Sequence, residues 1–184
     1  MHYYIHGYLS SPESTKGSLL NEKLGVKPVK YRECKPEDLV VKDCVNQIIK
    51  NIQDDNHAVL IGSSLGGLLA AKTAYLKPQN IDLMVLLNPA IIPPDFDISS
   101  ITDMPHRILK DMQDERLFEK KNNIPIYIIR GTKDKVVPDE WIYSYAKKQE
   151  ATVKFIHDDH RISKNISELP IMIKQILKLE NDIK

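Results

Sequence analysis

Short apolar runs alternate with amphipathic segments along the chain. The runs lie at residues 2–6, 29–33, 57–61, 82–88, 124–130 and 152–157, and several of them are continuously apolar. Runs of this kind are typical of strands that are covered on both faces. The pattern therefore predicts about six strands, mostly parallel, with helices on both sides of the sheet.

The segments between the runs have apolar residues at helical spacing. An amphipathic helix is expected within residues 36–55, because Pro36 suits a first helical turn and the later apolar positions share one face. Another helix is expected from about residue 168, near Pro170. This alternation predicts the α/β class: a three-layer sandwich with a doubly wound sheet, strand order 2-1-3-4-5-6 and right-handed crossovers.

One connection is too long for a simple crossover. It runs from about residue 89 to 122, opens with a proline-rich stretch and then places Met104, Ile108 and Met112 on one helical face. This segment is the predicted lid, although a helix that faces the core would have the same spacing. With 184 residues the chain has the length of one domain, so we expect a single domain over residues 1–184.

Charge and composition exclude several classes of function. The formal net charge is +1 and the two signs are mixed throughout, so no footprint for nucleic acid or an anionic membrane is present. No run of about 18 apolar residues and no signal peptide is visible, so no membrane span is expected. Cys34 and Cys44 lack metal-ligand spacing and are expected to be reduced thiols, which favours a cytoplasmic location. His2, His57 and His106 lack such spacing too, and no metal is predicted.

The stretch GSSLG at residues 62–66 lies between an apolar run and a helix-like segment. Centred on Ser64 it fits a nucleophile elbow, in which a strained turn projects the hydroxyl and the residues two before and two after must be small. Centring it on Ser63 would put Ile61 and Leu65 at those crowded positions. Ser64 is therefore the predicted nucleophile. The alternative is a small-residue packing turn, or a helix N-terminus that binds an anion.

A serine nucleophile needs a histidine base and a carboxylate that orients it. In this fold they follow the serine in the order acid, histidine, each after a later strand. Asp134 follows the fifth run and His160 the sixth, so they are the predicted acid and base. Asp139 is the rival acid, but it suits a first helical turn, and His157 is the rival base, but it lies at the strand end. Either predicted residue alone would be an ordinary polar loop residue; the order of all three supports the assignment.

Two backbone amides are expected to bind the oxyanion. One is the amide of Leu65, directly after the nucleophile at a helix N-terminus. The other is the amide of Tyr8, because Gly7 lets the loop after the first run turn close to the serine. The neighbouring His6 is expected to be a buried structural imidazole rather than a chemical group.

The substrate-binding residues are predicted from their place in the chain. Tyr8 and Leu9 leave the first run beside the oxyanion amides, and Pro89 and Ile91 leave the fourth run toward the same rim. Together they would form an apolar wall, which predicts an apolar acyl group.

Together these motifs resemble the α/β-hydrolase superfamily, and specifically its small single-domain bacterial esterases of the YqiA type. The resemblance covers nearly the whole chain, and its most specific parts are HGYLSSPESTKG, GSSLGG, GTKDKVVP and DDHRI. It implies esterase or thioesterase activity on acyl substrates and assigns Ser64, Asp134 and His160 to a triad. The chain departs from many larger hydrolases because it has no room for a full cap domain.

The main hypothesis is a cytoplasmic serine hydrolase that cleaves a carboxylic ester or thioester through an acyl-enzyme. It would act on a small-molecule substrate and need no cofactor. A hydrolase-like module that only binds a ligand or partner is the alternative from another class, because fold does not dictate function. An amidase, peptidase or acyltransferase would use the same residues, and the sequence leaves these, and the oligomeric state, open.

Overall fold

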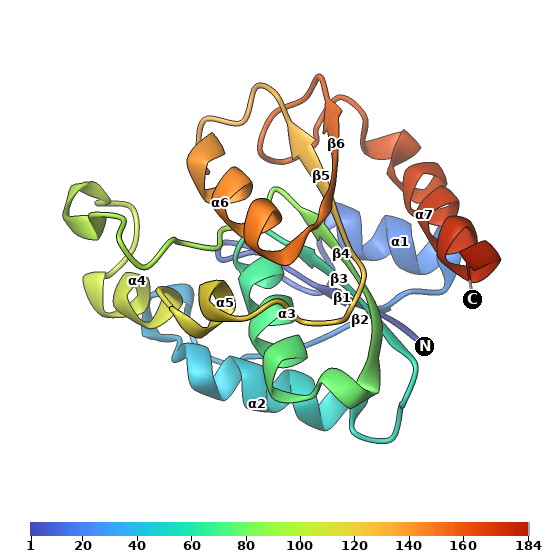
Figure 1. The fold of residues 1–184 in the computed structure, drawn as a ribbon, viewed down its shortest axis with the longest axis horizontal. Helices are drawn as coiled ribbons and strands as arrows, with labels where there is room; N and C mark the ends of the chain where they lie inside the picture. Colours follow the sequence, from blue (N-terminus) through green and yellow to red (C-terminus); the bar gives the residue numbers. More distant parts are fainter. Residues whose placement is uncertain (184) are drawn as a thin grey trace.

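A parallel six-stranded sheet forms the centre of the structure, a computed structural model that describes residues 1–183 (Figure 1). Its strands are β1 (His2–Ile5), β2 (Lys27–Pro28), β3 (Ala58–Ser63), β4 (Ile81–Leu87), β5 (Ile126–Gly131) and β6 (Thr152–Ile156). Their order is β2-β1-β3-β4-β5-β6, and each neighbouring pair is parallel. The predicted fold class and strand order are confirmed.

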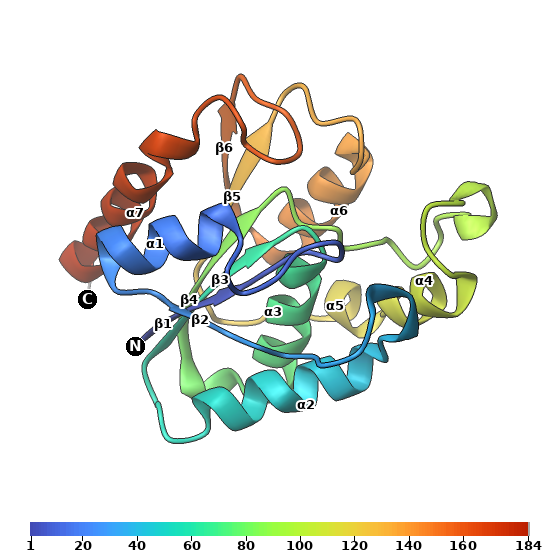
Figure 2. The same cartoon turned by 180° about the vertical axis from the view of Figure 1, so that it is seen from behind.

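Helices cover both faces of the sheet, as Figures 1 and 2 show from opposite sides. α1 (Thr15–Leu24) and α7 (Leu169–Ile183) pack on one face, over a core that includes Leu20, Ile61 and Ile173. α2 (Val41–Ile52), α3 (Leu65–Leu76) and α6 (Asp139–Gln149) pack on the other face, over a larger core. Short 3-10 helices lie at Pro36–Asp38, Pro78–Asn80, Ile98–Ser100 and Ile166–Glu168.

The second strand differs from its prediction. The apolar run at residues 29–33 suggested a strand there, but β2 comprises only Lys27–Pro28, opposite Tyr3 and Tyr4. The Val29 amide still donates to the carbonyl of Tyr4 at 2.8 Å, and then the pairing ends. It ends because β1 stops at Ile5, so the following residues have no strand beside them. Val29 and Tyr31 are nevertheless buried, which explains the apolar pattern.

The long connection between β4 and β5 contains α4 (His106–Met112) and α5 (Arg116–Glu119). Ile108 and Met112 are buried in the core and Met104 packs against it, so α4 is a core-facing helix, the alternative given for that spacing. Asp114 ties the segment to α3, because its Oδ2 pairs with Lys72 at 2.6 Å and with Arg116 at 2.7 Å.

All six strands point the same way, so the loops that follow them meet at one edge of the sheet. That edge carries the turn after β3 and the loops after β1, β4, β5 and β6, where the predicted site residues lie.

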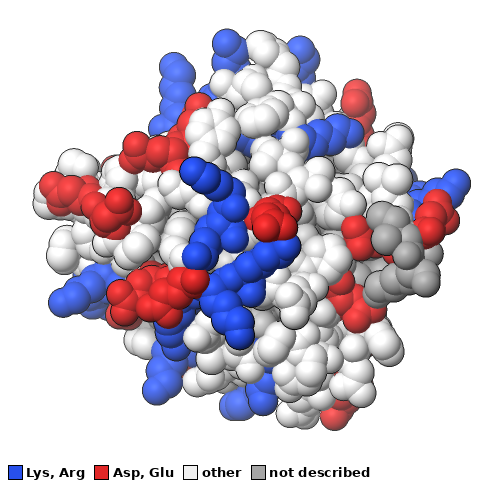
Figure 3. Space-filling view, viewed as in Figure 1, with Lys and Arg blue, Asp and Glu red and all other residues white. Residues whose placement is uncertain are grey.

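On the face seen in Figure 3, basic side chains near the centre are flanked by acidic ones. No helix within residues 1–183 is long and apolar enough to cross a membrane.

Candidate active site

Ser64 occupies a strained turn between β3 and α3. Its backbone has φ 55° and ψ −119°, and α3 begins at the next residue. Positive φ is costly for a residue with a side chain, and it persists only where the surrounding structure enforces it. Here the amide of Ser64 donates to the carbonyl of Leu87 at 3.0 Å, and its carbonyl accepts from the amide of Ala90 at 3.0 Å. Neighbouring β4 therefore holds the turn on both sides.

The two glycines of GSSLG are required by close backbone contacts. A Cβ on Gly62 would lie 2.4 Å from the carbonyl oxygen of Gly66, and a Cβ on Gly66 would lie 2.0 Å from that of Ile5. Both contacts are with backbone, which cannot rotate away. The steric argument made for GxSxG therefore holds at both positions.

The two serines point to different environments. Ser63 is 6% exposed, and its side chain hydrogen-bonds with the hydroxyl of buried Tyr4. The Oγ of Ser64 instead lies 3.0 Å from Nε2 of His160. Only Ser64 is in contact with a base.

His160 links Ser64 to a carboxylate. Its Nδ1 lies 2.8 Å from Oδ2 of Asp134, whose side chain is fully buried, whereas the imidazole is 19% exposed. An Nδ1–H that donates to Asp134 leaves Nε2 free to accept the serine proton. The three predicted residues thus form one continuous chain of hydrogen bonds, while the rival His157 is exposed and the rival Asp139 pairs with Arg130.

Four donors fix the Asp134 carboxylate. Its Oδ1 accepts from the amides of Val136 and Val137 at 2.7 and 3.1 Å, and its Oδ2 accepts from Arg130 at 2.5 Å as well as from His160. Burial disfavours the charged carboxylate, but the hydrogen bond and charge of His160 and the two amides outweigh it and hold the pKa of Asp134 below its usual value. Asp134 is therefore a charged, oriented acceptor.

The loop that carries His160 is organised by its own acidic residue. The buried Asp158 carboxylate accepts from the amides of Asp159, Lys164 and Asn165 at 2.8–3.1 Å. Burial opposes ionisation of Asp158, yet these amides lower its pKa. Asp158 thus shapes the loop that carries His160.

Asn88, directly after β4, connects the turn that carries Asp134 (the acid turn, residues 131–137) to the loop that carries His160 (the histidine loop, residues 157–165). It is fully buried; its Oδ1 accepts from the Gly131 amide at 2.8 Å, and its Nδ2 donates to the carbonyls of Asp159 and His160 at 3.2 and 3.1 Å. One side chain thus sets the position of Asp134 relative to His160.

The loop after β1 packs directly against Ser64. A Cβ on Gly7 would lie 3.3 Å from Cβ of Ser64 and from the carbonyl oxygen of Ser63, a tight contact that glycine avoids. Within residues 1–183, the amides of Tyr8 and Leu65 have no hydrogen-bond acceptor. Both therefore remain available to an oxyanion.

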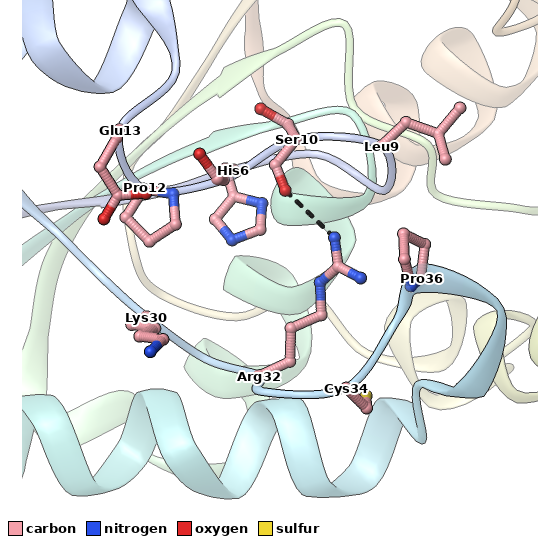
Figure 4. Close-up of a pocket in the computed structure, with 10 residues that line it drawn as sticks. His6, Leu9, Ser10, Pro12, Glu13, Lys30, Arg32, Cys34 and Pro36 are labelled. Carbon is pink, nitrogen blue, oxygen red and sulfur yellow. Dashed lines mark hydrogen bonds between the residues drawn. The ribbon is translucent and has the colours of Figure 1, made fainter.

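Arg32 holds this loop through its backbone carbonyls. Its Nη2 donates to the carbonyls of Tyr8 and Ser10 at 2.6 and 3.1 Å, and Figure 4 shows the guanidinium directed at Ser10. Nε and Nη1 of Arg32 are buried and have no hydrogen-bond partner within residues 1–183. A surface depression of about 440 Å³ lies here, lined by His6, Leu9 and Arg32 among others.

His6 is a structural residue, as expected. It is 2% exposed, its Nδ1 lies 2.9 Å from the carbonyl oxygen of Gly7, and its ring stacks on Tyr31 at 4.3 Å. Burial lowers the pKa of His6 to about 4, so the ring is neutral at neutral pH.

The residues predicted to form an apolar wall are dispersed. Ile91 is 1% exposed within the core and Pro89 is buried against Gly67, whereas Leu9 is 79% exposed. Tyr8 is half-buried against the core. The assignment of Ile91 to an open rim was wrong, because the chain turns inward directly after Pro89.

Arg130, Asn88 and Arg32 were not identified from the sequence. The one available signal for the first two was a polar residue at the end of an apolar run, where this fold places its site. Arg32 had no such signal. No cluster of three or more potential metal ligands occurs among the described residues.

Comparison with known proteins supports the fold. Est1E from Butyrivibrio proteoclasticus, solved with ferulic acid bound, is 18% identical with a TM-score of 0.80, and the match covers 98% of this chain and 89% of that one. Mouse alpha/beta hydrolase domain-containing protein 10 is 18% identical with a TM-score of 0.76 and coverages of 96% and 89%. The monoacylglycerol lipase of Paleococcus ferrophilus is 17% identical with a TM-score of 0.74 and coverages of 97% and 94%. The chain therefore has the α/β-hydrolase fold.

No curated protein matches the sequence. A family model does, over residues 1–179, and its description is that of an uncharacterised protein family. Because the match spans nearly the whole chain, and the fold agrees with the resemblance drawn from the motifs, the protein belongs to the UPF0227 family of α/β-hydrolase fold.

Proposed function

We propose that the chain is a serine hydrolase that cleaves a carboxylic ester or thioester of an apolar acyl group through an acyl-enzyme. The observation that carries this proposal is the continuous hydrogen bonding from Asp134 through His160 to Ser64, at 2.8 and 3.0 Å. A serine, a base and an orienting acid in this arrangement form an activated nucleophile. The names of Est1E, solved with ferulic acid, and of a monoacylglycerol lipase point to esters.

Each residue has a defined part in the reaction. Ser64 Oγ attacks the acyl carbon while His160 Nε2 takes its proton, and Asp134 stabilises the resulting imidazolium. The amides of Tyr8 and Leu65 bind the oxyanion. The imidazolium then protonates the leaving alcohol or thiol, which leaves an acyl-serine. Water then attacks the acyl carbon while His160 Nε2 takes its proton. The bond between the acyl carbon and Ser64 Oγ breaks, the imidazolium returns the proton to Oγ, and the carboxylic acid leaves.

The acyl group is proposed to be apolar, with Tyr8 as its contact beside the oxyanion amides. Each methylene that this contact accommodates would add up to about 0.8 kcal/mol of binding. Specificity constants for aryl esters of increasing acyl length, in wild type and in Tyr8→Ser, test this. A flat series would reject the apolar acyl group and leave the serine chemistry unaffected.

The decisive experiment is labelling with a fluorophosphonate, followed by peptide mapping and ester hydrolysis assays. Wild type and Ser63→Ala are expected to be labelled at Ser64 and to hydrolyse esters, whereas Ser64→Ala is inert. Circular dichroism confirms the fold of each variant. No labelling of wild type would reject the hydrolase in favour of a binding module, and labelling at Ser63 would overturn the assignment. Hydrolysis of amides but not esters would indicate an amidase or peptidase.

A further inference from the structure

We propose that Arg130 is a positioning residue of this site: it shares the Asp134 oxygen that His160 uses, orients the carboxylate, and limits how strongly that carboxylate holds a proton on the imidazole. The inference rests on the proposed function only in treating His160 as the base.

Arg130 is a buried cation at the end of β5. Its side chain is 2% exposed, and its Nε and Nη2 donate to Oδ1 of Asp139 at 3.0 and 2.7 Å. Nη2 also donates to the carbonyl of Val137 at 2.8 Å, and Nη1 donates to Oδ2 of Asp134 at 2.5 Å. Arg130 is thus shared between a buried carboxylate in the site and a carboxylate that is 63% exposed at the start of α6.

The shared oxygen is what couples Arg130 to the base. Oδ1 of Asp134 is occupied by two backbone amides, so Oδ2 alone faces both Arg130 and Nδ1 of His160. Among residues 1–183, Arg130 and His160 are the basic side chains that hydrogen-bond to Asp134. Arg130 therefore contacts the same carboxylate oxygen that orients the imidazole, and its Nη1 also donates to Oδ1 of Asn88 at 3.4 Å.

The sign of the effect follows from electrostatics. A carboxylate beside an imidazole favours the protonated ring, and a cation on the same carboxylate opposes this. Without Arg130, Asp134 would hold the imidazolium more firmly, and fewer molecules would carry the neutral base at neutral pH. The carboxylate would also lose one of its four hydrogen bonds.

Other charges surround the site at greater remove. On the histidine loop these include Asp158, whose carboxylate accepts from loop amides. Lys16 of α1 donates to the carbonyl of Arg161 at 2.6 Å. Further ones are His157, Asp159, Arg161 and Lys164 in the histidine loop, Lys133 and Lys135 in the acid turn, and Asp139 and Glu140 in the first turn of α6. Arg130 differs from the other cations in contacting the carboxylate itself.

The main test is the pH dependence of kcat/KM for an aryl ester. In Arg130→Gln the midpoint of the acidic limb is expected to rise by about 1 pH unit, in the range that a charge within about 6 Å produces. Arg130→Lys keeps the positive charge and is expected to keep the wild-type midpoint with a lower plateau. A lower plateau in Arg130→Gln without a higher midpoint would indicate a merely structural role and overturn the proposal.

A second variant tests the opposite direction. Asp139→Asn removes one of the two carboxylates that share Arg130, so more of its charge bears on Asp134 and the midpoint should fall by a few tenths of a unit. Asp43→Asn is the matched control, because it removes an acid from the first turn of α2 that contacts none of these residues. If Arg130→Gln does not fold, this pair decides: a midpoint in Asp139→Asn that is unchanged or raised relative to Asp43→Asn overturns the proposal.

A readout without catalysis separates the two hypotheses. The ¹³C shift of the His160 ring, followed by NMR against pH in Ser64→Ala, reports the protonation of the imidazole directly. The pH midpoint of this titration is expected to rise in Arg130→Gln and to fall in Asp139→Asn, as in the kinetic test. If these shifts are found but the wild-type chain hydrolyses no ester, the proposed function is refuted and the role of Arg130 is supported. If the shifts are absent, that role is refuted.

Discussion

His6 is expected to make the fold sensitive to mild acid. Burial lowers the pKa of His6 to about 4, whereas an unfolded chain has the ordinary value of about 6.5. The unfolded state therefore binds a proton in this interval that the folded state does not. The stability due to the neutral ring is fully present above about pH 6.5 and is lost as the pH falls toward 4.

The magnitude follows from the size of the shift. A difference of about 2.5 pKa units corresponds to about 3 kcal/mol of unfolding free energy. The ring is 2% exposed and stacked on Tyr31, so solvent screens this effect little. About 3 kcal/mol is a large part of the stability of an ordinary domain.

The assay is urea unfolding at several pH values between 7 and 4, in wild type and in His6→Asn. Asparagine can still donate to the carbonyl of Gly7 but does not titrate, so the variant should be less stable at pH 7 yet lose less stability on acidification. His157→Asn, which changes an exposed histidine, should keep the wild-type slope. Equal slopes in wild type and His6→Asn would refute the reasoning.

Four further predictions concern the site and its supports. His160→Ala should lower ester turnover by about 10³-fold or more and His157→Ala only slightly, and the reverse ranking would assign the role of base to His157. The activity of wild type should fall when acid protonates the base. Arg32→Met removes the hydrogen bonds to the carbonyls of Tyr8 and Ser10 and should lower kcat by about 10-fold, and an unaltered kcat would count against the role of this loop. The free energy of unfolding should be nearly unchanged, because the substitution also removes two buried nitrogens that have no hydrogen-bond partner within residues 1–183. Gly66→Ala should lose about 4 kcal/mol or more, since its Cβ would lie 2.0 Å from a carbonyl, and a Tm near that of wild type would contradict this. Asp114→Asn should lower the free energy of unfolding in urea by about 3 kcal/mol, because it leaves the ammonium of Lys72, 11% exposed, without its carboxylate partner. Burial disfavours the carboxylate of Asp114, but hydrogen bonds from Arg116 and Lys72 outweigh burial and lower its pKa to about 2, so the advantage of wild type should persist down to about pH 4 and shrink below it.

The sequence allowed the fold and the proximity of Ser64, His160 and Asp134 to be predicted because both depend on local rules. Continuous apolar runs identify buried parallel strands, and the glycines of GSSLG follow from contacts that any strand-to-helix elbow creates. The order of Asp134 and His160 after Ser64 follows from strands that all point one way.

The missed features depend on distances that periodicity does not encode. Arg130 lies at the end of an apolar strand, and its two carboxylates come from the folded turn after β5 and from the start of α6. Residues 29–33 have a strand-like pattern, but the length of β1 decides whether they have a partner. Ile91 follows a strand end like the true site residues, and the inward path of the chain after Pro89 places it in the core. The second strand depends on a segment that is remote in sequence, whereas the carboxylates that pair with Arg130 lie four and nine residues after it and reach it only when the turn is folded.

Backbone strain marks the same edge of the sheet that the side chains mark. Four residues other than glycine have positive φ within the described chain: Ser64, Asn88, Glu150 and Ile162. Glu150 caps the end of α6, but the other three lie in the turn after β3, the loop after β4 and the histidine loop. Such conformations cost about 1–3 kcal/mol each, and Ile162 is β-branched, for which positive φ is especially unfavourable. Burial of Ile162 in the core below α7 and the hydrogen bonds of Asn88 offset that cost. Apart from the helix cap at Glu150, the strain lies in loops that carry or contact Ser64 and His160, as expected where the geometry of a site outweighs local stability.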